Sequence, residues 1–257
     1  MPSSTSVQRL AVLIDADNAS AKIADGLFVE IAKIGEASVR RIYGDFSSPR
    51  SKAWTDILQT YAIMPHQTFA YTTGKNASDI ALVIDAMDLL HTGRFDGFCL
   101  VSSDSDFTSL AARIREQGVD VFGFGEQKTP ESFRQACKRF IYTENLILEA
   151  PAADQPNKPD ERPKSIVQSP AKAVPLISRA LSQLDTDADD GWVALGGVGQ
   201  RLSVLSPDFD PRTYGCAKLS DLIEKSKAFE LKLVSGRGPY VRTKVADKPA
   251  RAAKTTK

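Results

Sequence analysis

The stretch at residues 95–107, which reads FDGFCLVSSDSDF, constrains the fold more than any other part of this 257-residue chain. Its apolar run at 98–101 is typical of a strand buried on both faces, and an amphipathic helical pattern begins directly afterwards at Phe107. This order predicts an alternating α/β chain, in which residues just after the carboxyl end of a buried strand lie where ligands bind. Here those residues include Asp104 and Asp106.

The positions of Asp104 and Asp106 allow two interpretations. Two carboxylates only two residues apart repel each other, so they need a cation or a proton, and oxygen ligands of this kind suit Mg²⁺ or Mn²⁺. Alternatively, Ser105 caps the following helix, and the two carboxylates interact favourably with the positive end of the helix dipole. This stretch alone favours neither interpretation.

The rest of residues 1–149 repeats the alternation of strands and helices. Apolar runs predict further strands, and helical spacing predicts the helices between them: strands at 10–14, 38–43, 66–71 and 119–124, and helices at 19–34, 49–61, 78–90, 107–117 and 130–139. Several connections are only a few residues long, which predicts a parallel sheet with helices on both faces. Right-handed crossovers then place the carboxyl ends of the strands at one edge.

Two more aspartates are expected at that edge. Asp15 follows the first strand directly, and Asp79 lies in the first turn of the helix that precedes the strand at 98–101. Each has a structural alternative, because aspartate commonly caps a helix or lies in its first turn, and Asp17 would serve as a cap equally well. The candidate metal ligands are therefore Asp15, Asp79, Asp104 and Asp106.

Composition limits the class of protein. The apolar content of 42% is ordinary for a globular protein, no apolar run is long enough to span a membrane, and the first residues lack the pattern of a secretory signal. Cys99, Cys137 and Cys216 are too scattered for a disulfide framework or a zinc site, so they are expected to be reduced core residues. These features predict a cytoplasmic protein with no membrane partner.

A second, smaller domain is expected after a linker. Residues 150–173 are rich in Pro, Ala and charge, which is typical of an extended linker. Over residues 174–243 the apolar spacing predicts three helices, the second at 192–205, and a hairpin at 229–242, which together describe a winged-helix-like module. Residues 244–257 are rich in Lys, Ala and Thr and are expected to form a disordered basic tail.

Charge is distributed unevenly between the two halves of the chain. Residues 1–150 carry 15 Lys and Arg against 19 Asp and Glu, whereas residues 151–257 carry 18 against 13. The basic second half predicts a polyanionic partner such as RNA, single-stranded or structured, with aromatic side chains available to stack unpaired bases. Alternatively, this surface is solvated or binds a protein. The candidate RNA contacts are Arg212, Tyr214, Lys218, Arg237, Tyr240 and Arg242.

Four motifs, in order along residues 9–148, resemble the NYN family of PIN-like ribonucleases, and its bacterial LabA-like members in particular. They read VLIDADN, ASDIALVIDAMDLL, FDGFCLVSSDSDF and FRQACKRFIYTENL. The resemblance implies a Rossmann-like PIN core whose carboxylates bind a divalent metal and cut RNA. In such a site Asn18 could donate a hydrogen bond to a phosphate oxygen. By position, the matching site residues are Asp15, Asn18, Asp79, Asp104 and Asp106.

The later part of the chain is similar to the OST-HTH or LOTUS domain. The matching motifs are GWV, LGGVG, PDFDPRTYG and KLSDLIEK, within residues 174–243. This resemblance implies an RNA-binding domain, although some members of the family bind protein instead.

Together these features predict a metal-dependent endoribonuclease with an accessory RNA-binding domain. Lys138 occupies a position where relatives usually have aspartate, so the alternative is a degenerate core that binds RNA or protein without cleavage. A third alternative is phosphotransfer through an aspartyl phosphate at Asp15, although Ala19 stands where such enzymes have threonine or valine. A protein partner for the second domain and a homo-oligomer also stay open.

Overall fold

The computed structural model of the chain describes residues 7–68, 76–147, 167–184, 191–234, 236 and 238–244. They form two units, the first containing Met1–Ile166 and Ser206–Thr213 and the second containing Val167–Leu205 and Tyr214–Lys257. The first unit is therefore built from two separate parts of the chain. Most of the predicted linker, and the predicted tail beyond Lys244, lie outside the described residues.

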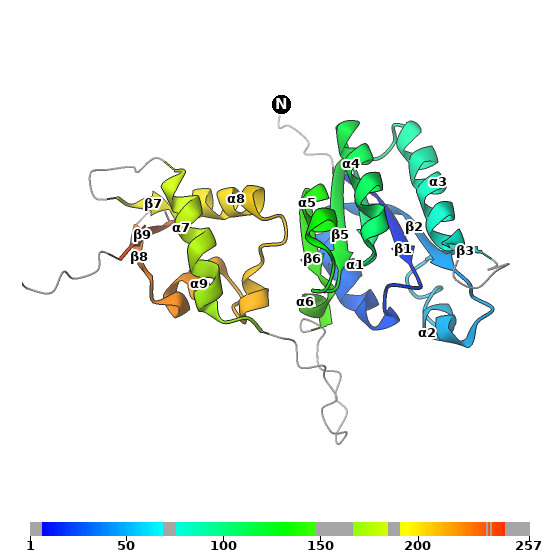
Figure 1. The fold of residues 1–257 in the computed structure, drawn as a ribbon, viewed down its shortest axis with the longest axis horizontal. Helices are drawn as coiled ribbons and strands as arrows, with labels where there is room; N and C mark the ends of the chain where they lie inside the picture. Colours follow the sequence, from blue (N-terminus) through cyan, green and yellow to red (C-terminus); the bar gives the residue numbers. More distant parts are fainter. Residues whose placement is uncertain are drawn as a thin grey trace, which may run out of the picture. The chain divides into compact units, whose positions relative to one another are not determined.

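A six-stranded parallel sheet forms the centre of the first unit (Figure 1). Its strands are β1 (Arg9–Asp15), β2 (Glu36–Gly44), β3 (Met64–Gln67), β4 (Gly97–Val101), β5 (Asp120–Gly125) and β6 (Arg139–Tyr142). The strand order is β3-β2-β1-β4-β5-β6, so the direction of winding reverses between β1 and β4. In open α/β sheets the crevice outside the strand ends at such a reversal is the usual ligand site. The predicted α/β parallel fold is confirmed.

Helices cover both faces of this sheet. They are α1 (Ala24–Ala32), α2 (Lys52–Thr55), α3 (Ala77–His91), α4 (Thr108–Glu116), α5 (Glu131–Ala136) and α6 (Thr143–Ile147). Successive residues of a strand face opposite sides of the sheet. In β1, Leu10, Val12 and Ile14 pack into the core that contains residues of α1 and α6, whereas Ala11 and Leu13 pack into the core that contains residues of α3 and α4. Asp15 continues the second set and therefore faces α3.

The predicted helix at 49–61 is much shorter in the structure, which is a correction to the sequence analysis. Ser48 caps a 3-10 turn at Pro49–Ser51, and α2 then ends at Thr55. The next residues turn instead, because the chain must reverse to enter β3. The reversal uses a left-handed backbone at Ala62, with φ of 50°, and a 2.9 Å hydrogen bond from Ile63 N to Leu58 O.

Three helices and a three-stranded antiparallel sheet form the second unit: α7 (Val174–Ser182), α8 (Leu195–Leu205), α9 (Leu219–Ser226), β7 (Val193–Ala194), β8 (Phe229–Val234) and β9 (Gly238–Thr243). The predicted small module of helices and a hairpin is confirmed. The helix predicted to begin at Trp192 begins three residues later, because Val193 and Ala194 pair with Val241 and Tyr240 of β9.

Two further expectations concern the cysteines and the membrane. Cys99, Cys137 and Cys216 are all buried and unpaired, as expected for reduced core residues. Among the described helices, none combines the length and the apolar character that crossing a membrane requires.

Candidate active site

The carboxyl ends of β1 and β4 bring the predicted acidic residues to one edge of the sheet. Asp15 ends β1, and the loop after β4 carries Asp104 and Asp106. Asp79 lies in the first turn of α3 and is close enough to the other three for their charges to raise its pKa. We call these four residues the acidic edge.

The Asp15 carboxylate is buried and fully hydrogen-bonded by neutral groups. Only 1% of the residue is exposed. Its Oδ1 accepts from the backbone nitrogens of Asp17 (3.0 Å) and Asn18 (3.2 Å), and its Oδ2 accepts from Asn18 Nδ2 (2.9 Å) and Ser102 Oγ (2.7 Å). Burial raises the pKa of Asp15, and these four donors oppose that rise. They fix the carboxylate in place and occupy its acceptor sites.

Asp104 and Asp106 form the start of the helix that follows β4. Asp104 is the N-cap of the 3-10 turn Ser105–Phe107, because its Oδ1 accepts from the backbone nitrogen of Asp106 at 2.9 Å. One interpretation of the sequence made Ser105 the cap, but in the structure the cap is Asp104. Capping uses only one oxygen of this carboxylate. Asp106 is exposed, and its Oδ2 accepts from Asn76 Nδ2 at 3.3 Å.

Asp79 is the least compensated carboxylate of the acidic edge. Burial, followed by the charges of Asp15, Asp104, Asp17 and Asp106, raises its pKa from 3.8 to about 6. Among the described residues, no Lys or Arg forms an ion pair with any residue of the acidic edge. The negative charge here is therefore left without a protein cation.

A hollow of about 210 Å³ opens beside these carboxylates. Its lining is mostly apolar, with exposed Ile80 and Ile84 on α3. The lining residues are Asn76, Asp79, Ile80, Val83, Ile84, Asp106 and Phe107. Asp79 and Asp106 thus face a space that a ligand can enter.

The donor set of the acidic edge suits a hard divalent cation, because it consists of carboxylate oxygens with excess negative charge. In the part of the chain that the structure describes, however, no three His, Cys, Asp or Glu side chains form a ready-made metal cage. Mutual repulsion keeps uncompensated carboxylates apart, and a cation reverses that force. The residues therefore fit a metal that draws them together, rather than a rigid preformed site.

Several small polar residues at this edge were missed by the sequence analysis. Ser102 bridges the two strand ends, since its Oγ donates to Asp15 and accepts from the backbone nitrogen of Asp104 at 3.0 Å. Ser78 Oγ donates to Asp17 Oδ2 at 3.1 Å, which links α3 to the loop after β1. Asn18, which was predicted as a site residue, donates from its Nδ2 to Asp15 Oδ2. The signal for the two serines was available, because Ser78 precedes Asp79 directly and Ser102 lies two residues before Asp104.

Close approach of β4 and β5 depends on Gly125. A Cβ at this position would lie 2.6 Å from the backbone oxygen of Ser102, closer than atoms can pack. Glycine therefore lets the end of β5 support the loop that holds Ser102 against Asp15.

Lys138 lies away from the acidic edge. Its Nζ donates to Asp120 Oδ2 at 2.6 Å, and Asp120 is the first residue of β5. In a parallel sheet the strand beginnings lie at the edge opposite the strand ends. The lysine is therefore paired at the far edge, where it neutralises none of the four aspartates.

The predicted RNA contacts are distributed over several elements. Lys218 is exposed at the start of α9, Tyr214 ends a 3-10 turn at Pro211–Tyr214, and Tyr240 and Arg242 lie on β9. Arg237 lies outside the described residues.

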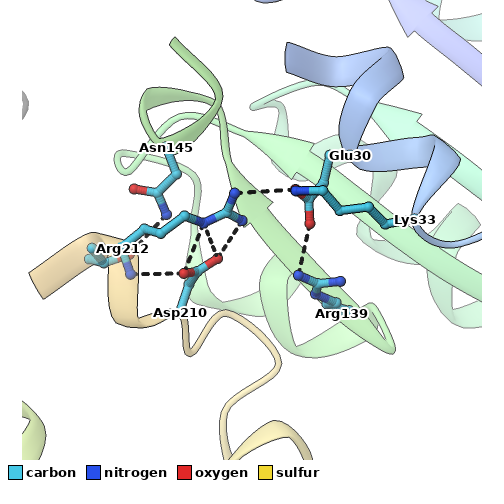
Figure 2. Close-up of polar contacts among 7 residues, drawn as sticks. Glu30, Lys33, Arg139, Asn145, Asp210 and Arg212 are labelled. Carbon is cyan, nitrogen blue, oxygen red and sulfur yellow. Dashed lines mark hydrogen bonds and ion pairs between the residues drawn. The ribbon is translucent and has the colours of Figure 1, made fainter. Parts of the chain in front are cut away.

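Arg212 differs from the other candidates because carboxylates of the first unit surround it. Its guanidinium lies between Asp210 and Glu30 (Figure 2), with Nη2 2.6 Å from Asp210 Oδ2 and Nη1 3.2 Å from Glu30 Oε2. Glu30 also accepts from Lys33 Nζ (2.9 Å) and Arg139 Nη2 (3.0 Å). We call these five residues the Glu30 network. In this arrangement Arg212 binds protein carboxylates rather than presenting its charge to phosphate.

The fold and the acidic edge together define a Rossmann-like α/β protein with an unneutralised carboxylate site at its topological switch point. Residues 9–148 match the NYN domain, and residues 154–241 match the OST-HTH/LOTUS domain. The chain belongs to the NYN family, and an OST-HTH/LOTUS domain follows its NYN domain.

Similar solved structures add little to this assignment. A crystal structure of a protein of unknown function from Vibrio parahaemolyticus RIMD 2210633 is 20% identical, with a TM-score of 0.45 over 54% of this chain and 94% of that chain. A solution NMR structure of an uncharacterized protein from Nitrosomonas europaea is 32% identical, with a TM-score of 0.27 over 38% of this chain and 93% of that chain. No curated protein matches the sequence.

Proposed function

We propose that the chain is a divalent-metal-dependent endoribonuclease, in which the acidic edge cuts RNA and the OST-HTH/LOTUS domain helps to bind it. The observation that carries this proposal is the negative charge around Asp79, which no protein cation among the described residues balances. Burial and then the charges of four neighbouring aspartates raise its pKa to about 6, and among the described residues no Lys or Arg is paired with it. A structural charge cluster would carry its own cations, whereas a cluster that binds a metal leaves the positive charge to the ligand.

The residues of the acidic edge have two kinds of role in the proposal. Asp79, Asp104 and Asp106 supply oxygens to Mg²⁺ or Mn²⁺, and buried Asp15 supplies negative charge held in place by Ser102 and Asn18. A bound divalent cation lowers the pKa of water and stabilises the charge that develops on a phosphodiester. The adjoining hollow leaves room for the RNA strand next to Asp79 and Asp106.

The alternatives raised by the sequence are less well supported. A degenerate core was suggested by Lys138, but this lysine is paired with Asp120 at the start of β5. An aspartyl phosphate at Asp15 requires an accessible nucleophilic oxygen, whereas both oxygens of this residue accept two hydrogen bonds in a buried site.

The test is cleavage of end-labelled single-stranded RNA in Mn²⁺, Mg²⁺ or EDTA, with wild type beside Asp104→Asn. Asparagine keeps the oxygen that caps the turn but removes the charge, so the fold is expected to persist. We expect a loss of cutting of about 100-fold or more, because removal of a metal ligand weakens stabilisation of the transition state by several kcal/mol.

Asp120→Asn is the matched control, because it removes one aspartate charge from the opposite edge of the sheet. It should cut RNA at the wild-type rate. If wild type cuts RNA equally well in EDTA, or if Asp104→Asn cuts normally, the proposed site is wrong. If wild type binds RNA and never cuts it, the chain is a binding scaffold.

A further inference from the structure

The small sheet of the second unit has one face in the core and one face outside it. Val193 of β7, Val241 of β9 and Phe229 of β8 are buried. The residues at odd spacing from them along each strand point the other way, because side chains alternate along a strand. These outward residues, which we call the outer face, are Trp192, Ala194, Glu230, Lys232, Tyr240 and Arg242.

Two cations gather at the ring of Trp192 on this outer face. Lys232 Nζ lies 4.2 Å and Arg242 Cζ lies 4.6 Å from the centroid of the indole. The pairing of strands explains the cluster, since Lys232 is directly opposite Tyr240, and Glu230 is directly opposite Arg242. Trp192 is only partly buried.

Arg242 and Lys232 differ in how firmly they are held. Glu230 Oε2 accepts from Arg242 Nε and lies near its Nη2, both at 2.6 Å, so the plane of the guanidinium is fixed beside the indole. Lys232 is exposed, and its ammonium forms no hydrogen bond or ion pair with any described residue. An exposed ammonium over an indole is held weakly. A planar ligand can therefore displace Lys232 while Arg242 stays in place.

We propose that the outer face is a stacking site for an unpaired base of single-stranded RNA. Trp192 provides the ring on which the base stacks, Arg242 supports that ring, and Lys232 moves to the adjacent phosphate. Aromatic rings flanked by cations are the usual platform for single strands, because every base has a π-face and every nucleotide carries a negative charge. This proposal rests on RNA binding by the OST-HTH/LOTUS domain, but it does not depend on cleavage by the acidic edge.

The experiment uses the full chain in EDTA, so that no metal-dependent cutting occurs, and a 12-nucleotide oligouridylate as the probe. Its matched partner is an oligomer of the same length in which the central nucleotides are abasic, so the phosphates are kept and the bases are lost. The chain contains two tryptophans, and Trp54 is buried with 2% exposure. Quenching of tryptophan fluorescence therefore reports on Trp192, and the quench should be absent for the abasic oligomer.

Three variants separate stacking from charge and from folding. Trp192→Leu should weaken binding about tenfold or more, because a base stacked on an aromatic ring contributes that much to affinity. Lys232→Met should flatten the dependence of log K on log salt by about 0.7, the effect of one phosphate contact. Leu233→Ser changes an exposed neighbour on the other side of the same strand and should bind like wild type.

The outcomes are distinct. Equal affinity for the two oligomers, with no quench, would overturn the stacking site while leaving RNA binding intact. No RNA binding by wild type would overturn the stacking site and favour a protein partner for this domain, with the cleavage proposal tested separately. Circular dichroism melting of each variant excludes loss of fold, and Trp192→Phe keeps an aromatic ring if Trp192→Leu does not fold.

Discussion

The Glu30 network and the acidic edge both hold carboxylates out of water, but their charges are balanced in opposite ways. Glu30 is 2% exposed and contacts Lys33, Arg139 and Arg212. Burial acts to raise the pKa of Glu30, and the Lys33 hydrogen bond together with the charges of Arg212 and Arg139 outweighs burial, so the pKa is lowered. Asp79 has the same burial effect without cations, and its pKa rises.

This difference is expected if the Glu30 network is structural and the acidic edge is the proposed metal site. A buried carboxylate is costly, and a protein that needs it only for structure supplies arginine or lysine next to it. The Glu30 network joins two distant parts of the chain, because Asp210 and Arg212 come from Ser206–Thr213 while the other three come from the NYN domain. In the acidic edge, repulsion between carboxylates that no protein cation among the described residues neutralises lowers the stability of the fold.

The largest stability effect is expected from Arg212→Met, which tests the structural side of this comparison. Methionine keeps much of the side-chain volume but leaves Glu30 and Asp210 without their shared cation. Removal of one partner from a buried ion pair is strongly destabilising, so we expect a loss of about 3 kcal/mol in the free energy of unfolding. Urea unfolding followed by Trp54 fluorescence, in a Trp192→Phe background, measures the first unit alone.

Arg139→Met is the matched control, because this arginine also contacts Glu30 but its side chain is 43% exposed. It should lose less than about 1 kcal/mol. Equal stability of Arg212→Met and wild type would mean that Ser206–Thr213 is not an integral part of the first unit.

The next largest effect on stability is expected from Asp79→Asn, which tests the acidic edge, where negative charge is not balanced by protein cations among the described residues. A carboxyl with a folded-state pKa of about 6, above its ordinary 3.8, favours folding when protonated and loses that contribution as pH rises through 6. Asparagine never acquires the charge. The full shift would correspond to about 3 kcal/mol, and solvent screening of this partly exposed group reduces it. In EDTA the variant should therefore match wild type near pH 4 and exceed it by about 1–2 kcal/mol at pH 8.

Thermal melting at the two pH values measures this gap. Addition of Mn²⁺ at pH 8 should raise the melting temperature of wild type more than that of Asp79→Asn, because the cation replaces the missing positive charge. Asp88→Asn, an exposed aspartate on the same helix, should show no gap. A variant that is less stable than wild type at pH 8 would make Asp79 a structural residue.

Local patterns were sufficient to predict the sheet and the acidic edge. Apolar runs and helical spacing are properties of neighbouring residues, and the crossover rule turns them into a sheet whose strand ends meet. Asp15, Asp104 and Asp79 could therefore be brought together without a structure. Their hydrogen bonds could not, because Ser102 reaches Asp15 across two strands that are 87 residues apart in sequence.

The missed features depend on contacts between distant residues. The motif FDPRTYG predicts that Arg212 is an exposed phosphate contact. The structure instead pairs it with Glu30, which is 182 residues away in sequence. The sequence predicts that a helix begins at Trp192, but in the structure Val193 and Ala194 pair with β9. In each case the competing local pattern was reasonable, and tertiary pairing decided the outcome.

The smallest effect is expected from Lys138→Ala, which tests whether the acidic edge stands alone. The ammonium of Lys138 contacts Asp120 at the start of β5, and its side chain is 53% exposed. A surface ion pair contributes little, so stability should fall by less than about 1 kcal/mol. Because this charge lies at the edge opposite Asp15 and Asp104, and salt screens exposed charges within about 8 Å, metal-dependent cutting should equal that of wild type. Measurement of the cutting rate across a Mn²⁺ titration is the sensitive form of this test. If Lys138→Ala binds Mn²⁺ more tightly, the lysine does offset the acidic edge, and the contrast with the Glu30 network is weaker than the structure indicates.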